Sequence, residues 1–529
     1  MKLLNGIVWL LVTVAILEPV TAQELKIIPQ PNSYHVTQGK FDFTNNLSIS
    51  SEDTVFSDLI PVFSSQLLKY TRIECSTQKN NPEIKLIRTS NPKISNEAYQ
   101  LLITPEQIQV SAASAEGAFY GLQSLVQLLL NAKQNGESLS CGLIEDAPRY
   151  AWRGFMLDES RHFFGKHEVK KILDMMALHK LNKFHWHLTD EPGWRIEIKK
   201  YPLLTTVGGR GTQWDPEAPA AFYTQDEIRE IVKYASDRFI EIIPEIDMPG
   251  HATAAVKAYP EFSGGGSADH PNFTFHPARE GTYVFLTDIL REVATLFPSQ
   301  FVHIGGDEVH FGNQDWSKSQ EVSTLMEQNG LKDLVDVEHY FLTRMADSIR
   351  ALGKTVMGWD EVTNAGLDNT NTWVMWWRHD KPELLKNAVD KGFAVILCPR
   401  RPLYFDFVQH ESHKEGRRWG GFCPIEDVYD FPNAKMAGGE SYKSSLVKGI
   451  QANAWTETMH TPQRLEFMVF PRLSALAEAA WTMEAEKNYA RFKNNLSWMI
   501  SFYENQGIHT FDPLKPDRIE EVKGARQKK

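Results

Sequence analysis

Two patterns of apolar and polar positions follow each other along the chain and predict two parts. In the first part apolar residues alternate with polar ones, as in Ile84-Lys85-Leu86-Ile87, a period of two that indicates half-buried strands. Apolar residues then recur three and four positions apart from Ala115 to Leu129, which predicts an amphipathic helix with Ser114 as its N-cap. We therefore expect a small α/β domain over residues 23–147, ending before Pro148 because proline interrupts both element types.

The second part, residues 148–505, consists of short apolar runs separated by amphipathic stretches. This alternation is expected of parallel strands joined by helices. Eight runs predict eight strands, the number that closes a (β/α)8 TIM barrel. The predicted strands are residues 152–157, 183–188, 240–246, 301–304, 355–358, 372–376, 394–398 and 449–454. The predicted helices are residues 166–179, 225–238, 283–297, 337–352 and 382–390, and residues 506–529 form a C-terminal tail.

Charged and aromatic side chains follow the predicted strands, at the end of such a barrel that carries the active site. Asp307 and Glu308 come after the fourth strand and directly after two glycines, which let the backbone approach a ligand closely. Neighbouring carboxylates push each other's pKa apart, so one can stay protonated while the other is charged. An Asp-Glu pair alone is more often a solvated surface feature, but its place after an apolar strand favours an active site.

The hexapeptide His303-Ile304-Gly305-Gly306-Asp307-Glu308 resembles the His-x-Gly-Gly-Asp-Glu signature of glycoside hydrolase family 20. The resemblance covers nearly all of residues 25–500, and it implies the same fold, a barrel behind a small α/β domain. It also implies an exo-acting retaining β-N-acetylhexosaminidase, in which the substrate's own 2-acetamido oxygen attacks the anomeric carbon and forms an oxazolinium intermediate. The matching positions are, in order, Arg161, Asp190, His251, Trp359, Tyr404, Asp406, Trp455 and Glu457.

The resemblance implies roles for the residues that surround the reacting atoms. Glu308 would protonate the leaving oxygen and later activate water, while Asp307 would orient the acetamido N–H and offset the positive charge of the intermediate. Tyr404 would donate a hydrogen bond to the acetamido oxygen. The wall of the acetamide pocket would be formed by Trp359, Trp455 and either Trp376 or Trp377, between which the sequence does not decide.

Further residues are implied in recognition of the terminal sugar. Arg161, Asp406 and Glu457 would bind its hydroxyls, since a buried polar partner rejects a sugar that lacks the matching group. Asp190 and His251 would form a pair that steers Glu308. No cofactor and no metal is implied.

Composition restricts the partners of the chain. The formal net charge is -11, and no basic run is longer than the Arg-Gln-Lys-Lys end, which argues against nucleic acid and fits a neutral glycan with a terminal N-acetylhexosamine. No segment approaches the ~20 apolar residues of a membrane span. Among the four cysteines, Cys398 and Cys423 are either a disulfide or free buried thiols. The sequence leaves open the oligomeric state, the linkage and the choice between gluco and galacto epimers.

Three other functions compete with this interpretation. A barrel metallohydrolase is the enzymatic one, with ligands drawn from His185, His187, His303, Asp307 and His310, although most strand ends offer Trp, Tyr or carboxylate instead. A carbohydrate-binding protein that lost turnover is another, because fold and function are separable. Within the family, a lacto-N-biosidase that releases a disaccharide is the nearest alternative.

The first 22 residues predict export to the periplasm or the medium. Lys2, an apolar stretch from Ile7 to Leu17 and the small residue Ala22 have the order of a signal peptide. Mass spectrometry of the protein from the periplasm or medium should therefore give a chain that begins at Gln23. A protein that still begins at Met1 would contradict the assignment.

Overall fold

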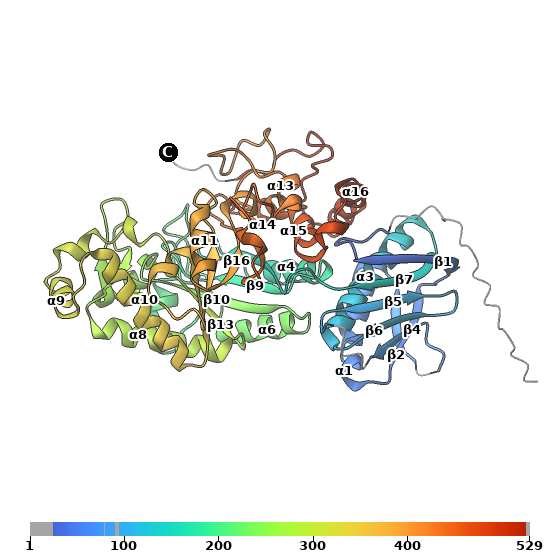
Figure 1. Cartoon of the computed structure of the whole chain (residues 1–529), viewed down its shortest axis with the longest axis horizontal. Coiled ribbons are helices and arrows are strands. Elements are labelled where there is room, and N and C mark those ends of the chain that lie inside the picture. The colour runs from blue at the N-terminus through green and yellow to red at the C-terminus, as the bar shows by residue number, and fades with distance from the viewer. Residues whose placement is uncertain (1–24, 79, 90–94, 525–529) are drawn as a thin grey trace, which may run out of the picture.

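A computed structural model describes residues 25–78, 80–89 and 95–524, and Figure 1 shows two parts. The earliest strands form a small sheet domain, and the rest of the chain forms a larger body around a barrel. The expected signal peptide, residues 1–22, lies outside the described residues. Within the described ranges, every helix is too short or too polar to span a lipid bilayer.

The small domain is a seven-stranded sheet covered by helices. Its elements are β1 (Ser33–Phe41), β2 (Asn46–Ser51), α1 (Thr54–Ser57), α2 (Ile60–Thr71), β3 (Glu74–Thr77), β4 (Ile84–Arg88), β5 (Tyr99–Ile103), β6 (Ile108–Ala112), α3 (Ala115–Asn135) and β7 (Leu139–Asp146). The strand order is β1-β7-β5-β6-β4-β2-β3, and α3 packs on β5 and β6. The predicted helix is confirmed as α3: the Ser114 side chain accepts a hydrogen bond from the Gly117 amide, and the helix ends at Gly136 in the left-handed conformation.

All eight predicted barrel strands are present, in the closed order β8-β9-β10-β13-β14-β15-β16-β17, so the expected (β/α)8 barrel is confirmed. Every neighbouring pair is parallel. The strands are β8 (Trp152–Asp158), β9 (Lys183–His187), β10 (Glu241–Met248), β13 (Phe301–Gly305), β14 (Thr355–Trp359), β15 (Thr372–Trp376), β16 (Ala394–Leu397) and β17 (Val447–Ala454).

Helices surround the barrel, and shorter elements lie in the loops. The longer helices are α4 (Lys166–Leu178), α6 (Gln225–Ser236), α8 (Glu280–Leu296), α9 (Gln320–Asn329), α10 (Leu334–Ala351), α11 (Pro382–Asp390), α14 (Pro462–Val469), α15 (Arg472–Trp481) and α16 (Tyr489–Asn505). The shorter elements are α5 (Leu203–Thr206), α7 (Thr253–Ala258), α12 (Arg400–Leu403), α13 (Ile425–Asp430), the strands β11 (Ser263–Gly265) and β12 (Thr274–Phe275), and the 3-10 helices η1 (Pro260–Phe262), η2 (Val309–Phe311), η3 (Gln314–Lys318), η4 (Asp360–Asn364), η5 (Ser441–Lys443) and η6 (Glu484–Glu486).

Aromatic side chains fill the amino-terminal end of the barrel. Trp152, Phe301 and Trp373 come from the starts of three different strands, and their ring centroids lie 4.7–6.0 Å apart. Such contacts between rings fill space with little void and exclude water. These rings block the amino-terminal end, and the carboxyl end of the strands is where such barrels bind their ligands.

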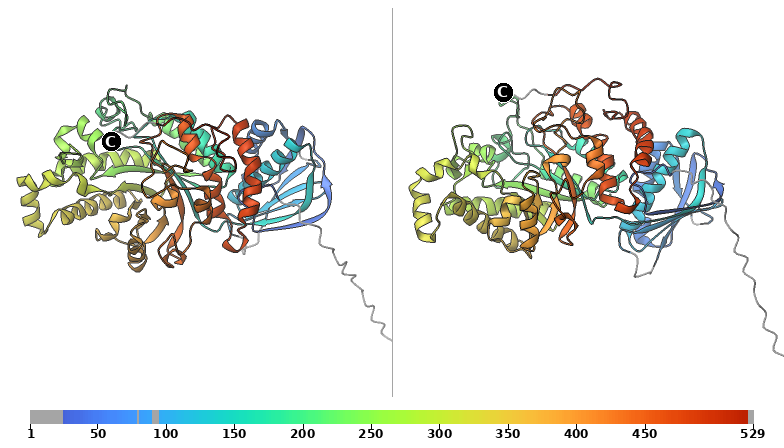
Figure 2. Two further views of the ribbon diagram at one scale, coloured as in Figure 1. Left: turned by 90° about the horizontal axis from the view of Figure 1, so that it is seen from above. Right: turned by 45° about the horizontal axis from the view of Figure 1, so that its top comes forward.

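The sheet domain is fixed to the barrel by buried polar contacts. Lys180, after α4, pairs with Asp146 at 3.0 Å, and the indole N–H of Trp481 in α15 donates to the same carboxylate at 2.9 Å. Gln127 of α3 donates to the carbonyl of Leu178 at 2.9 Å. Figure 2 shows α16 and the end of the barrel domain beside the sheet in both views. Removal of either charge would leave the other buried without its counter-charge, so the ion pair ties the two parts together.

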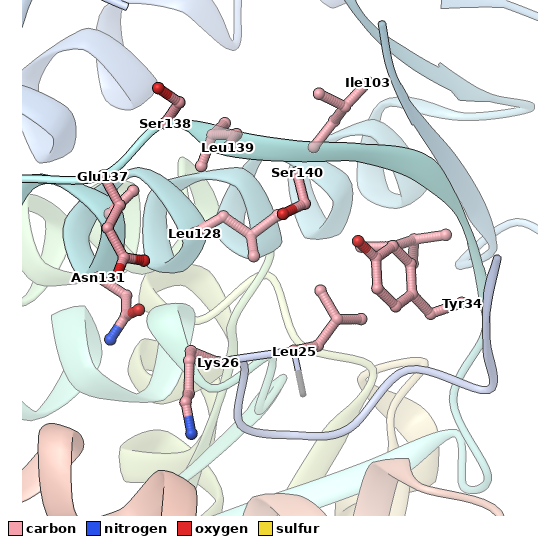
Figure 3. A pocket seen from close by; sticks show the side chains of 12 residues that line it. Leu25, Lys26, Tyr34, Ile103, Leu128, Asn131, Glu137, Ser138, Leu139 and Ser140 are labelled. Atoms are coloured by element: carbon pink, nitrogen blue, oxygen red, sulfur yellow. The ribbon is translucent and has the colours of Figure 1, made fainter. Parts of the chain in front are cut away.

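A small cavity lies within the sheet domain, between α3, β7 and the first described residues (Figure 3). Its volume is about 60 Å³, and Leu128, Leu139 and Tyr34 are among its lining residues. This space suffices for a few water molecules, and it is too small for a sugar ring. The search for a functional site therefore moves to the barrel.

Candidate active site

A cavity of about 160 Å³ opens where the barrel strands end, and it gathers most of the residues that the sequence singled out. Each lining residue comes from the barrel part of the chain. The lining residues are Arg161, Asp190, His251, Asp307, Glu308, Trp359, Trp377, Arg400, Tyr404, Arg417, Trp419, Trp455 and Glu457.

The turn after β13 presents Asp307 and Glu308 to this cavity. Gly305 and Gly306 have φ of 67° and 88°, in the left-handed region that favours glycine. A Cβ atom on Gly305 would lie 1.8 Å from the Oδ1 atom of Asp247, so no side chain fits there. The two glycines of the sequence signature therefore have a steric cause, a sharp turn packed against the carboxyl group of Asp247.

Asp307 is a buried carboxyl group with an unusual pKa. Burial, together with the nearby Glu308 carboxylate, raises its pKa to about 7, although the His251 ring acts in the opposite direction. Its Oδ1 atom has no hydrogen-bond partner among the described residues. A buried polar atom without a partner is costly, and here it points to a group that a ligand would satisfy.

Three side chains link Glu308 to the barrel interior. The Nε2 atom of His251 lies 3.8 Å from Glu308 Oε2 and 3.6 Å from Asp307 Oδ2, and its Nδ1 atom lies 3.0 Å from Asp190 Oδ1. Burial lowers the pKa of His251, but the carboxylates of Asp190, Asp247 and Asp307 raise it well above its ordinary value overall. This shift favours the protonated ring, which faces both carboxyl groups, and the expected contact between Asp190 and His251 is present.

Aromatic rings form one wall of the cavity. Trp359 and Trp455 have centroids 5.8 Å apart, and Tyr404 lies 6.1 Å from Trp455. Trp377 belongs to the same buried cluster, and its indole N–H donates to Glu361 at 3.0 Å. Burial raises the pKa of the Tyr404 hydroxyl well above its ordinary value, so the phenol stays protonated and can donate.

The structure places Trp377 on this wall and Trp376 elsewhere. Trp376 is the last residue of β15 and packs in the apolar core of the barrel. Successive strand residues point to opposite faces, so only one of two adjacent tryptophans can face the barrel mouth. Of the two residues that the sequence left open, Trp376 is therefore not a cavity residue.

Ion pairs also border the cavity, and the Arg161 guanidinium lies over the ring of Trp455, 5.1 Å from its centroid. Arg417 contacts Asp406 at 2.8 Å and Glu457 at 2.5 Å, and Arg161 contacts Asp190 at 2.6 Å. Asp406 is buried beside Arg417 and does not line the cavity. The Oε2 atom of Glu457, the indole nitrogen of Trp455 and the Nε2 atom of His251 lack hydrogen-bond partners among the described residues. Several buried donors and acceptors thus meet at one cavity, as a ligand with several hydroxyl groups requires.

Sequence reasoning missed three lining residues: Arg400, Arg417 and Trp419. Arg400 lies between two rings, with its guanidinium carbon 5.0 Å from the centroid of Trp377 and 5.1 Å from that of Trp419. The segment Gly416-Arg417-Arg418-Trp419-Gly420 carries a usable signal, because glycines that flank basic and aromatic residues are typical of a binding loop.

Some of the residues considered as metal ligands lie close together, and one does not. His251, Asp307 and Glu308 lie close enough to hold an ion, and so do His185, Glu245 and His303. His310, one of the ligands considered, is exposed and belongs to no such group in the described part of the chain. All four cysteines are free thiols, so Cys398 and Cys423 are not joined.

A TIM barrel whose mouth holds paired carboxyl groups beside an aromatic wall defines a class of protein, the barrel glycoside hydrolases. Residues 150–484 match the family model "Glycosyl hydrolase family 20, catalytic domain", and residues 24–147 match "Glycosyl hydrolase family 20, domain 2". The chain belongs to glycosyl hydrolase family 20.

Named relatives agree with this membership. The chain is 34% identical to a beta-hexosaminidase of Porphyromonas gingivalis over 93% of its length, and it spans 65% of that relative. It is 34% identical to a beta-hexosaminidase of Vibrio furnissii, covering 86% of this chain and 76% of the relative. Its structure matches the exo beta-N-acetylglucosaminidase of Vibrio harveyi in complex with N-acetylglucosamine, with a TM-score of 0.84 and 32% identity, over 93% of this chain and 79% of that one.

The raised pKa of Asp307 predicts a pH-dependent cost in stability. A carboxyl group whose pKa is about 7 when folded and 3.8 when unfolded binds its proton more tightly in the folded state, so its contribution to stability falls as the pH rises from 4 to 7. The isosteric Asp307→Asn should therefore become more stable relative to the wild type as the pH rises over this range. Thermal unfolding at pH 5 and pH 8 measures the difference, and Asp226→Asn on an exposed helix position is the control. A difference in melting temperature between Asp307→Asn and the wild type that does not change with pH would contradict the assigned pKa of Asp307.

Proposed function

We propose that this protein is an exo-acting β-N-acetylhexosaminidase that removes terminal β-linked N-acetylglucosamine or N-acetylgalactosamine with retention of configuration. The observation that carries this proposal is the aromatic wall of Trp359, Trp377, Tyr404 and Trp455 beside the unpartnered Oδ1 atom of Asp307. An acetamido group has an apolar methyl, an N–H donor and a carbonyl acceptor. The aromatic rings can pack on the methyl group, the Asp307 carboxylate can accept a hydrogen bond from the N–H, and the Tyr404 hydroxyl can donate one to the carbonyl oxygen.

In the proposed first step the substrate supplies the nucleophile. The acetamido oxygen attacks the anomeric carbon while Glu308 gives its proton to the glycosidic oxygen, so the leaving alcohol departs neutral. The sugar becomes an oxazolinium ion. In the second step the Glu308 carboxylate takes a proton from water, which attacks the anomeric carbon and reopens the ring. Glu308 thereby regains its proton.

Asp307 would stabilise the positive charge of the intermediate. Its pKa of about 7 leaves the free carboxyl group close to half ionised near neutral pH. A hydrogen bond from the acetamido N–H favours the charged form, so binding of the correct substrate promotes the ionisation that the reaction needs. A plain glucoside offers no N–H at this position, which gives discrimination against it.

Recognition of the sugar hydroxyls is assigned to the charged side of the cavity. Arg161 and Glu457 line it, and Arg417 joins Glu457 to the buried Asp406. Charged side chains that are already held by ion pairs lose little conformational freedom when a sugar binds. They also reject a sugar whose hydroxyl groups cannot make the matching hydrogen bonds. We also propose export to the periplasm or the medium, on the basis of the first 22 residues.

The role of Glu308 is tested with leaving groups of different quality. Glu308→Gln keeps the side-chain shape and removes the proton donor, so turnover should fall by about 10²–10⁴-fold on alkyl N-acetylglucosaminides. Nitrophenyl substrates should lose much less, because their leaving oxygens need little protonation. Steady-state kinetics on both classes measure this ratio, and equal losses would exclude Glu308 as the acid.

The source of the nucleophile is tested with an analogue of the intermediate. A thiazoline fused to the sugar imitates the oxazolinium ring and should inhibit far more strongly than N-acetylglucosamine itself. Asp307→Asn should weaken both turnover and this inhibition, because the cationic ring loses its counter-charge. Equal cleavage of 2-hydroxy and 2-acetamido sugars, or a covalent adduct of a 2-fluoro sugar on Asp307 or Glu308, would refute substrate assistance.

The metallohydrolase alternative is tested separately with a chelator. Loss of activity on chelation would favour a metallohydrolase.

A further inference from the structure

A carboxylate that does not line the cavity connects its two functional sides. Glu245 lies on β10 inside the barrel and is completely buried. Its Oε1 atom accepts a hydrogen bond from the indole nitrogen of Trp359 at 3.0 Å. Its Oε2 atom lies 2.6 Å from Nδ1 of His187 on the adjacent strand β9, where the two residues are opposite each other in register.

His187 continues the connection toward Glu308. Its Nε2 atom lies 2.9 Å from Oδ2 of Asp190, so each ring nitrogen faces a carboxylate oxygen. Both nitrogens donate only in the protonated ring, so this geometry favours an imidazolium between two carboxylates. The pKa of His187 agrees with a protonated ring. Burial lowers this pKa, but Glu245 and Asp190 raise it well above its ordinary value overall. Asp190 in turn contacts His251, which faces Glu308.

Glu245 remains charged although it is buried. Burial raises its pKa, but the rings of His303, His187 and His185 lower it well below the ordinary value overall. The ring of His185 approaches Oε2 at 2.9 Å, and that of His303 approaches Oε1 at 3.0 Å. Each carboxylate oxygen thus makes one hydrogen bond, with Trp359 or His187, and has one further ring beside it, and these contacts restrict its rotation. A group held in this way fixes the positions of whatever it contacts.

We infer that Glu245 and His187 are positioning residues that act on both sides of the site at once. Through His187 and Asp190 they hold His251 below Glu308, and through the indole nitrogen they hold Trp359 on the acetamide wall. The inference rests on the proposed function, because it assigns the acid to Glu308 and the acetamide to the wall. Neither residue touches the substrate.

The experiment compares variants that break one or both arms of this network. One arm runs from Glu245 through His187, Asp190 and His251 toward Glu308, and the other is the hydrogen bond between Glu245 and Trp359. Glu245→Gln keeps the shape but removes the negative charge and one acceptor oxygen, so the Trp359 indole and a protonated His187 ring cannot both donate to it. His187→Gln interrupts the arm toward Glu308 and the ring contact with Trp455, but leaves the Trp359 hydrogen bond in place. Trp359→Phe removes that hydrogen bond together with part of the indole ring. Glu241→Gln is the matched control on the same strand, since Glu241 pairs with Lys183 and Ser299 near the closed end of the barrel.

Two measurements separate the arms in the full-length protein. The ratio of kcat on nitrophenyl and alkyl N-acetylglucosaminides reports on the acid, and thiazoline inhibition reports on the acetamide wall. His187→Gln should lower kcat on the alkyl substrate by about 10²-fold, the cost of misplacing a catalytic group by about 1 Å, and should weaken inhibition less than Trp359→Phe does. Trp359→Phe should weaken inhibition by roughly tenfold and leave the ratio unchanged. Glu245→Gln should do both, and Glu241→Gln neither.

Several outcomes would overturn the inference. One is a folded Glu245→Gln whose ratio and inhibition match those of Glu241→Gln. Another is a His187→Gln that loses activity equally on both substrates. If Glu245→Gln and His187→Gln both fail to fold while Glu241→Gln folds, the network serves the barrel and not the chemistry, and the inference is wrong. A wild-type protein without activity on N-acetylhexosaminides would instead refute the proposed function.

Discussion

Burial of carboxylates around one cavity is the constraint on which the rest of the site depends. A charge removed from water must be paired, and most of these charges are. Asp190 has Arg161, His187 and His251, and Glu457 has Arg417. Asp307 has no cation within hydrogen-bond distance among the described residues: its Oδ1 atom lacks a partner, His251 lies 3.6 Å from its Oδ2 atom, and its pKa is raised to about 7. This oxygen atom is therefore available to accept a hydrogen bond from the acetamido N–H in the proposed reaction.

The barrel could be predicted from the sequence because of how parallel strands are buried. Strands covered on both faces read as short apolar runs, and helices between them keep their own period, so both signals were present. The sheet domain was predicted only in part: β1, β2, β3 and β7 were not assigned. Most positions of β1 are exposed or half-buried, and β3 has only four residues, so neither shows a clear alternation of apolar residues.

The site could be predicted where its residues follow a strand directly. Asp307 and Glu308 do so, and their place in the barrel follows from that. Arg417 and Trp419 lie between β16 and β17 in an irregular segment, where no period places a side chain. The partnership of His187 with Glu245 was hidden for another reason. The two residues are 58 positions apart and meet only through strand register, and the sequence alone offered His187 as a possible metal ligand.

Backbone strain at two positions shows how the acid is aimed. Glu308 and His251 have φ of 54° and 51°, a left-handed conformation that costs a residue with a side chain about 1–2 kcal/mol. Each follows the end of a barrel strand, where a relaxed residue would let the chain run straight on. Strain of this kind persists only where contacts with neighbouring residues hold the backbone in the strained conformation. Here Asp247 packs against Gly305 before one turn, and Asp190 holds the ring of His251 in the other. Seven non-glycine residues in the described part of the chain have positive φ, and His251 and Glu308 are the two of them that line the cavity, so the barrel sustains this strain where it brings the two side chains together.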